Sequence, residues 1–171
     1  MGRCCQQEDQ HHLSLGDMQD AKRRIGLEDG SGRPPLASYQ TLDVDGATYR
    51  GETKELVGKE VQHGRGEQTW ADGAVYVGDW VDGEPDGHGV KTKKEERWRY
   101  EGHWKQGARD GHGKQTWNDG SEYEGAWKQD ELAGEGVYQL PGGKSYSGAW
   151  VANAMHGQGT YCWPDGRQFT G

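Results

Sequence analysis

Aromatic residues and glycines alternate with charged residues along most of the chain. Tyr100, Gly102 and Trp104 occupy every second position of one stretch, and Glu101 and His103 fill the positions between them. Alternate side chains of an extended strand lie on opposite faces of a sheet. The alternation therefore predicts a β-strand with aromatic residues and glycine on one face and polar or charged groups on the other.

The same strand pattern returns at a nearly constant spacing. A Tyr-x-Gly-x-Trp signature starts at residues 76, 100, 123 and 146, a weaker copy starts at 49 with Thr53 in place of Trp, and a last copy begins at Phe169. Successive starts are 27, 24, 23, 23 and 23 residues apart. A fixed period in this range is typical of repeat proteins whose units stack on their neighbours.

Each repeat is predicted to contain a second strand. In the third repeat, Gly111, Gly113 and Trp117 share one parity. Residues 108–110 are predicted to form a polar turn before this strand, and residues 118–120 a hairpin turn after it, because Gly at the end of Asn-Asp-Gly adopts the positive φ that such turns need. Turns at both ends make the predicted fold all-β: an elongated, single-layer antiparallel meander of stacked β-hairpins.

Glycines of these strands are predicted to be structural. A large ring on one strand can lie over a glycine on the next strand, where no Cβ obstructs it. One hairpin buries too little apolar surface to offset the entropy of ordering about twenty residues, so stability is expected from the stack. The structural glycines are Gly78, Gly102, Gly111, Gly113, Gly125 and Gly148.

The repeated strands resemble the MORN repeat, and the resemblance covers residues 49–171. It implies a non-enzymatic MORN-repeat protein of the kind that serves in protein assembly and in membrane-linked or cytoskeletal scaffolds, including ciliary and flagellar ones. Repeat two departs from the pattern, because Lys91 and Lys93 stand where bulky residues are expected. The predicted groove should be least apolar there. The Gly-x-Gly strands that complete the resemblance lie at residues 64–66, 87–89, 111–113, 134–136 and 157–159.

The chain is predicted to have three regions. Residues 1–38 form a polar, mostly irregular N-terminal tail with a short helix from about Asp17, its N-cap, to Gly26. The basic residues 22–24 of this helix are expected to be solvated. Residues 39–48 are interpreted as a half-repeat that caps the first strand, and residues 49–171 as the repeat array.

Composition limits the classes of fold and partner. Only 30% of the 171 residues are hydrophobic, whereas 30 are glycine and 8 are tryptophan, so the apolar surface is concentrated in rings. The net charge of −8 disfavours nucleic acid as a partner. Three cysteines make no disulfide framework, and no signal peptide or long apolar run is visible. The chain is therefore expected to be cytoplasmic, with reduced cysteines.

The N-terminus carries a candidate lipidation site. Gly2 can accept myristate after removal of Met, and Cys4 and Cys5 can accept palmitate, which together would anchor the chain to a membrane. Gln6 stands where Ser or Thr is preferred, so two interpretations remain: dual acylation, or two incidental cysteines.

Residues 91–99 form a basic cluster with two interpretations, a contact for phosphoinositides or acidic partners, or a lengthened, solvated hairpin turn. The second is favoured because Glu95 and Glu96 lie within the cluster. At Gly171 the chain stops within a sixth repeat. This edge is expected to pair with a partner or another copy of the chain, unless the sequence is a fragment.

No catalytic, cofactor or metal site is predicted. His63, His88, His112 and His156 recur at equivalent turn-to-strand positions, which favours a repeat-consensus role over metal ligation. Cys162 has no neighbouring His or Asp arrangement that would activate its thiol. The sequence therefore gives no indication of an enzyme.

The leading hypothesis is a non-catalytic scaffold or adaptor that binds a partner protein, with a helix as the expected bound segment, in an aromatic-lined groove. One alternative is an acylated membrane-tethering module. Another is a regulatory fragment of a larger enzyme, since the family resemblance implies arrays beside lipid-kinase or SET methyltransferase domains. The predicted groove residues are Tyr76, Trp80, Tyr100, Trp104, Trp117, Tyr123, Trp127, Tyr146, Trp150 and Trp163.

Overall fold

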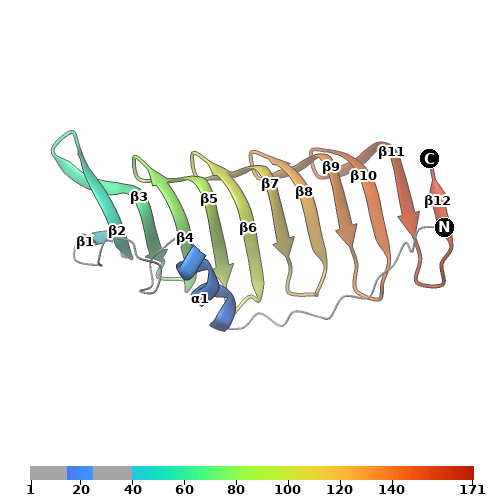
Figure 1. The fold of residues 1–171 in the computed structure, drawn as a ribbon, viewed down its shortest axis with the longest axis horizontal. Coiled ribbons are helices and arrows are strands. Elements are labelled where there is room, and N and C mark those ends of the chain that lie inside the picture. Colours follow the sequence, from blue (N-terminus) through green and yellow to red (C-terminus); the bar gives the residue numbers. More distant parts are fainter. Residues whose placement is uncertain (1–14, 25–39) are drawn as a thin grey trace.

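The computed structural model of the protein describes residues 15–24 and 40–171. In this part of the chain one helix and twelve strands form, and the strands make a single antiparallel sheet in the order β1 to β12 (Figure 1). The predicted all-β meander of hairpins is confirmed. The elements are α1 (Leu15–Arg24), β1 (Gln40–Val44), β2 (Ala47–Leu56), β3 (Lys59–Thr69), β4 (Ala74–Val81), β5 (Glu84–Lys93), β6 (Trp98–Lys105), β7 (Ala108–Thr116), β8 (Glu122–Lys128), β9 (Glu131–Gln139), β10 (Ser145–Val151), β11 (Ala154–Cys162) and β12 (Gln168–Thr170).

Tyrosine rings lie over paired glycines. The register places Gly78 of β4 opposite Gly89 of β5. The ring of Tyr76 covers this pair, and a Cβ added to Gly89 would overlap its ring atoms. Only glycine leaves room for a ring at this height above the sheet. The same arrangement recurs for Tyr49 over Gly66, Tyr100 over Gly113, Tyr123 over Gly136 and Tyr146 over Gly159.

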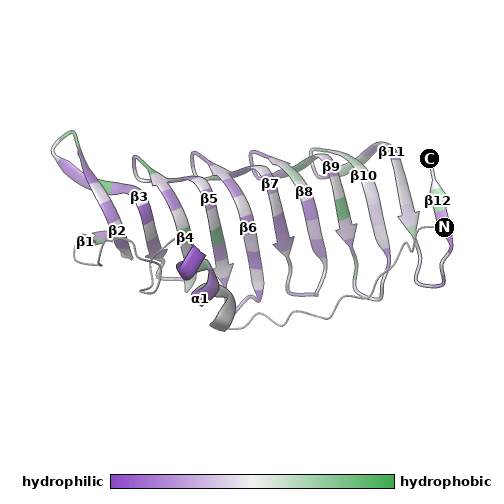
Figure 2. Ribbon diagram, viewed as in Figure 1, coloured by the Kyte–Doolittle hydropathy of each residue, from purple (hydrophilic) through white to green (hydrophobic). Residues whose placement is uncertain are grey.

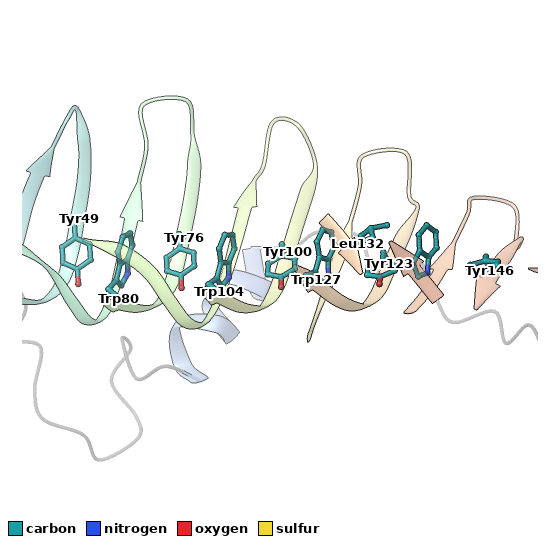
Figure 3. Close-up of a cluster of buried hydrophobic side chains, with 10 residues drawn as sticks. Tyr49, Tyr76, Trp80, Tyr100, Trp104, Tyr123, Trp127, Leu132 and Tyr146 are labelled. Atoms are coloured by element: carbon teal, nitrogen blue, oxygen red, sulfur yellow. The ribbon is translucent and has the colours of Figure 1, made fainter. Parts of the chain in front are cut away.

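Tyrosine and tryptophan rings alternate along the sheet in one continuous ladder (Figure 3). Tyr76 packs edge-to-face on Trp80 and on Trp104, with centroid distances of 5.1 and 5.3 Å. Equivalent contacts of 5.1–5.5 Å continue the ladder from Tyr49 to Trp150. Such aromatic pairs contribute about 0.5–1.5 kcal/mol each beyond the burial of their area. The face of the sheet that carries the ladder is called the ring face below.

Two kinds of turn occupy the two long edges of the sheet. Long turns, such as Trp70–Ala74, run along the lower edge in Figure 1, and short turns run along the upper edge. In the short turn between β6 and β7, Gln106 and Gly107 both have positive φ, 49° and 79°. The prediction of a turn at residues 108–110 is therefore wrong. These residues belong to β7, because the two left-handed residues before them already complete the hairpin.

The short turns are linked to one another by main-chain hydrogen bonds. The amide of Gly107 donates to the carbonyl oxygen of Pro85 at 2.9 Å, and that of Asn153 donates to Leu132 at 3.2 Å. In return, the amide of Leu132 donates to Asn153 Oδ1 at 2.8 Å. Each short turn is thus attached to the hairpin before it. The corresponding bonds in the other repeats join Gly83 to Gln62 and Asp130 to Arg109.

α1 lies on the opposite face of the sheet, which is called the helix face below. Val77 points to this face because it alternates with Tyr76 on β4. The helix contacts β4 and β5, where the paired residues Val77 and Val90 are 0% and 3% exposed. Ala21 of α1 is also buried. The short helix is therefore held on the sheet by a small apolar contact.

The structure corrects the predicted helix in two respects. α1 begins at Leu15, so Asp17 lies inside the helix rather than at its N-cap. The expectation that its basic residues are solvated is also wrong for Lys22, whose Nζ lies 2.9 Å from Glu67 Oε1. Arg24 Nη1 lies 2.8 Å from Glu101 Oε1. The two ion pairs reach β3 and β6, the strands on either side of the apolar contact.

Apolar residues are sparse on the strands. Figure 2 shows most of the sheet in purple or near white, with short green segments on β5 and β9. No helix in the described ranges is both long enough and apolar enough to cross a membrane.

Candidate partner-binding surfaces

Most residues of the predicted partner groove are buried in the ring ladder. Eight of the ten have exposed fractions of 0–8%, because neighbouring rings cover them. Trp117 and Trp163 are partly exposed. Contact of these ten residues with a partner stays a prediction. The buried eight are Tyr76, Trp80, Tyr100, Trp104, Tyr123, Trp127, Tyr146 and Trp150.

The ladder phenols donate hydrogen bonds to main-chain carbonyl oxygens. Tyr76 Oη donates to the carbonyl oxygen of Asp79 at 3.0 Å, and Tyr123 Oη donates to that of Ala126 at 3.0 Å. Burial raises the pKa of Tyr76 well above its ordinary value and raises the pKa of Tyr123 to about 12. These side chains are therefore part of the core rather than proton donors or acceptors for a ligand.

A second set of aromatic residues remains accessible on the ring face. Tyr138 packs on Trp117 at 5.3 Å with an interplanar angle of 32°, and Tyr161 packs on Trp163 at 4.7 Å. All four are partly buried, and Leu140 is 36% exposed. Tyr138 lies on β9 and Tyr161 on β11, whereas Trp117, Leu140 and Trp163 lie in the long turns that follow β7, β9 and β11. Trp117, Tyr138, Leu140, Tyr161 and Trp163 are called the aromatic strip below.

Three cations of the described chain lie over aromatic rings. Lys91 Nζ lies 4.5 Å from the ring centre of Trp70 and 5.9 Å from that of Trp104. Arg109 Cζ lies 4.2 Å from the ring centre of Trp127. A cation over an aromatic face is attracted by the ring quadrupole. Desolvation lowers the pKa of Lys91. Arg167 Cζ also lies 5.7 Å from the ring centre of Trp163, and the lower apolarity expected near repeat two stays a prediction.

Two basic residues of the cluster at residues 91–99, Lys93 and Arg99, are paired with carboxylates. Lys93 forms ion pairs with Glu96 and with Asp72, and Arg99 Nη2 lies 2.6 Å from Glu101 Oε2. The bond to Glu96 raises the pKa of Lys93, and Lys93 in turn lowers the pKa of the Glu96 carboxyl. This pairing supports a lengthened hairpin turn over a phosphoinositide contact.

A hollow of about 500 Å³ lies on the helix face over β7–β10. It is thus on the opposite side of the sheet from the predicted groove. Sequence reasoning missed it, because its depth depends on the relative sizes of side chains from four strands. Its walls include Lys114, Glu122, Glu124, Glu135 and Val137.

Other predicted chemistry is placed as follows. Among residues 15–24 and 40–171, no three His, Cys, Asp or Glu residues are grouped so that they could hold a metal ion. The rings of His88 and His103 pack edge-to-face at 5.6 Å. Cys162 is 3% exposed and disulfide-bonded, so it offers no free thiol, and the expectation of reduced cysteines is wrong for it. The lipidation candidates Gly2, Cys4 and Cys5 lie outside the described residues.

Space, rather than backbone conformation, restricts five of the six predicted structural glycines. A Cβ on Gly102 would overlap the Cα of Gly113 on the paired strand. Gly111 differs, because its φ of +107° belongs to the left-handed region and its Cβ would lie 2.9 Å from that of His103. The five are Gly78, Gly102, Gly113, Gly125 and Gly148.

The chain was compared with known proteins. A search of curated proteins finds no match. Among solved structures, the chain is similar to the TCP domain of SAS-4 (dCPAP) from Drosophila melanogaster, solved in complex with a proline-rich motif of Ana2 (dSTIL). The identity is 10%, the TM-score is 0.30, and the match covers 84% of this chain and 96% of that chain. The profile of the MORN repeat matches residues 61–75, 76–94, 100–122, 123–145 and 146–166. These segments make up more than half of the chain, which therefore belongs to the MORN-repeat family.

Proposed function

We propose that the protein is a non-catalytic scaffold that binds a partner protein on the ring face, over the aromatic strip. Membership of the MORN-repeat family indicates a protein-binding or membrane-associated repeat module. The observation that carries the proposal is the difference between the two sets of rings. The ladder rings are consumed in packing, whereas the strip keeps Trp and Tyr rings partly exposed beside it. Such rings are the usual anchors of protein interfaces.

The spacing of the strip supports a helix as the bound segment. Tyr138 and Tyr161 share one row of the sheet, because both are paired with Tyr146 on the strand between them. Two strand spacings amount to about 9.6 Å. Side chains at positions i and i+7 of a helix are about 10.5 Å apart along its axis. A helix lying across the strands can therefore place two apolar anchors, one near each tyrosine.

The cellular setting is part of the proposal. We place the scaffold in the cytoplasm, in a cytoskeletal, ciliary, flagellar or membrane-associated assembly, on the basis of the family resemblance. Imaging of the tagged full chain in its native cell tests this location, and a diffuse signal away from all such structures would contradict it.

The binding proposal is tested by comparing two folded variants of the full chain. In Tyr161→Thr/Trp163→Thr, two rings of the strip are removed from the ring face. In the control Val81→Thr/Val151→Thr, two exposed apolar residues, 42% and 55% exposed, are changed at the short-turn edge. Threonine suits a strand, so both variants are expected to keep the fold. Ladder residues such as Trp104 are unsuitable for this test, because their loss would destabilise the stack itself and so confound the binding measurement.

Quantitative co-purification from the native cell is the readout. A partner captured by the wild type and the control, but lost with the strip variant, supports the proposal, and the affinity of the purified partner should fall by about tenfold or more. Equal capture by both folded variants would show that the aromatic strip is not the binding surface.

A further inference from the structure

α1 shows which kind of segment the helix face accepts. It contacts β4 and β5, which carry the buried pair Val77 and Val90, and its own Ala21 is buried as well. From this contact Lys22 reaches β3 and Arg24 reaches β6, and each forms an ion pair with a glutamate. The face thus takes a helix that combines a small apolar residue with basic residues on both sides.

The positions under α1 recur further along the same row of the sheet. Val90 is paired with Val77 across β5 and β4, and Val137 is paired with Glu124 across β9 and β8. Each residue of the second pair lies 47 residues after its counterpart in the first. Val90 is 3% exposed, whereas Val137 is 36% exposed. The helix face therefore repeats the position that α1 covers but leaves the later copy accessible.

The hollow over β7–β10 surrounds this later copy, and its charge is negative. Glu122, Glu124 and Glu135 contribute three carboxylates, against one ammonium group from Lys114. Lys114 Nζ lies 2.8 Å from Glu122 Oε2, so its charge is already matched. Glu124 and Glu135 are exposed and make no ion pair with the rest of the described chain. Two carboxylates beside Val137 are thus available to a cationic ligand.

We propose that this hollow is a docking site for an amphipathic, basic helix of a partner protein. A small or apolar residue of that helix packs on Val137, and flanking Lys or Arg side chains pair with Glu124 and Glu135. The site differs from the α1 site in one respect. At the α1 site the carboxylates of β3 and β6 lie on either side of the apolar pair, whereas in the hollow Glu124 is paired directly with Val137 and Glu135 lies on the same strand as Val137. The basic residues of the partner must therefore lie closer to its apolar residue. The site is on the opposite face from the aromatic strip and is independent of the proposed function.

Charge complementarity selects this occupant over others. Within the described chain two carboxylates of the hollow make no ion pair, so the hollow repels an acidic segment. A fully apolar segment is also disfavoured, because it would desolvate these carboxylates without giving them a partner. Exposed ion pairs contribute little each and are screened by salt. Binding is therefore expected to be weak and to decrease as ionic strength increases.

The test uses the full chain and a synthetic peptide with the α1 sequence, residues 15–24, flanked by helix-favouring alanines. α1 already occupies its own site, so added peptide is expected to bind in the hollow. Amide shifts of the isotope-labelled chain in NMR titrations report where it binds. Shifts should gather at Glu124, Glu135 and Val137, and a scrambled peptide of equal charge should bind more weakly.

Two variants with equal charge change separate the site from general attraction. Glu124→Gln/Glu135→Gln is expected to lower the peptide affinity about tenfold. The control Glu55→Gln/Glu60→Gln neutralises two exposed glutamates that lie opposite each other at the tip of the β2–β3 hairpin. It should leave the affinity for the peptide nearly unchanged. Val137→Lys should also abolish binding while keeping the strand. Equal effects of the two double variants, shifts centred on Val77 and Val90, or no binding at low salt would overturn the proposal.

Discussion

Trp104 and Gly89 join neighbouring repeats, because the indole N–H of Trp104 donates to the carbonyl oxygen of Gly89 at 3.2 Å. The same indole packs edge-to-face against Tyr76 of the preceding repeat and Tyr100 of its own. One side chain thus supplies both ring contacts and a buried hydrogen bond across the boundary between two repeats. The bond recurs from Trp80 to Gly66, from Trp127 to Gly113 and from Trp150 to Gly136.

Replacement of Trp104 by Phe tests this boundary. Trp104→Phe keeps a ring but leaves the buried carbonyl of Gly89 without its donor, so the free energy of unfolding should fall by about 1–3 kcal/mol. Trp104→Ala should cost about 3–5 kcal/mol. Urea unfolding measures both. The control Trp98→Phe removes an indole that bonds the exposed Glu96, and its effect should stay within about 0.5 kcal/mol. Equal losses at Trp98 and Trp104 would contradict the role of the buried bond.

A double-mutant cycle tests the contact of Tyr100 with Gly113. A Cβ on Gly113 would meet ring atoms of Tyr100 first, so Gly113→Ala should destabilise the wild type by about 1–3 kcal/mol. In a Tyr100→Leu background the ring is gone, and the same change should cost less. Gly102→Ala serves as the comparison, because the backbone of Gly113 obstructs it and the Tyr100→Leu change should not relieve it fully. Additive effects of Gly113→Ala and Tyr100→Leu would show that the ring does not require the glycine.

Alkaline pH is expected to unfold the stack. Burial raises the pKa of Tyr76, Tyr100 and Tyr123 above the ordinary value of 10, so the folded state keeps these phenols protonated while the unfolded chain ionises. Their contribution is fully present below pH 10 and is lost as pH increases from there through the folded pKa values. Above pH 10 each phenol should remove up to about 1.4 kcal/mol per pH unit, or up to about 4 kcal/mol per pH unit for the three together.

Urea unfolding at several pH values measures this loss, and phenolate absorbance reports which state ionises. A free energy of unfolding that stays constant over this pH range, with phenolate already formed in the folded protein, would contradict the burial of these hydroxyl groups.

A substitution in α1 should release this helix from the helix face of the sheet without unfolding the repeat array. Ala21→Glu places a carboxylate against Val77 and Val90, near Glu67 and Glu101, so α1 is expected to leave the helix face. Hydrogen exchange of the Val77 and Val90 amides and proteolysis within residues 15–24 should both increase. Gln19→Glu adds the same charge at an exposed position of the helix and should leave both unchanged. Equal protection in the two variants would mean that Ala21 does not hold the helix in place.

The sheet could be predicted from sequence because its determinants are local. Tyr76, Gly78 and Trp80 lie on one strand, and their spacing alone indicates which face each occupies. The exact turn between β6 and β7 could not be placed, because nothing in the parity pattern shows that Gln106 takes a left-handed conformation. Periodicity therefore determines the strands and their faces, while the turn positions depend on single dihedral angles.

The candidate surfaces were harder to predict because burial depends on contacts between repeats. Trp104 and Trp117 are both predicted to line the groove, yet one is buried between two tyrosines and the other is partly exposed. The ion pair of Lys22 with Glu67 joins residues far apart in the chain, which a local pattern cannot reveal.

The two margins of the array differ in how they are connected. Main-chain hydrogen bonds link successive short turns, as from Gly107 to Pro85, whereas the long-turn edge is linked through side chains, as in the contact of Trp117 with Tyr138 of β9. The main-chain bonds hold the distance between neighbouring hairpins fixed at the short-turn edge, and the long-turn edge of the described sheet has no such restraint. Bending of this protein should therefore separate neighbouring hairpins more at the long-turn edge than at the short-turn edge.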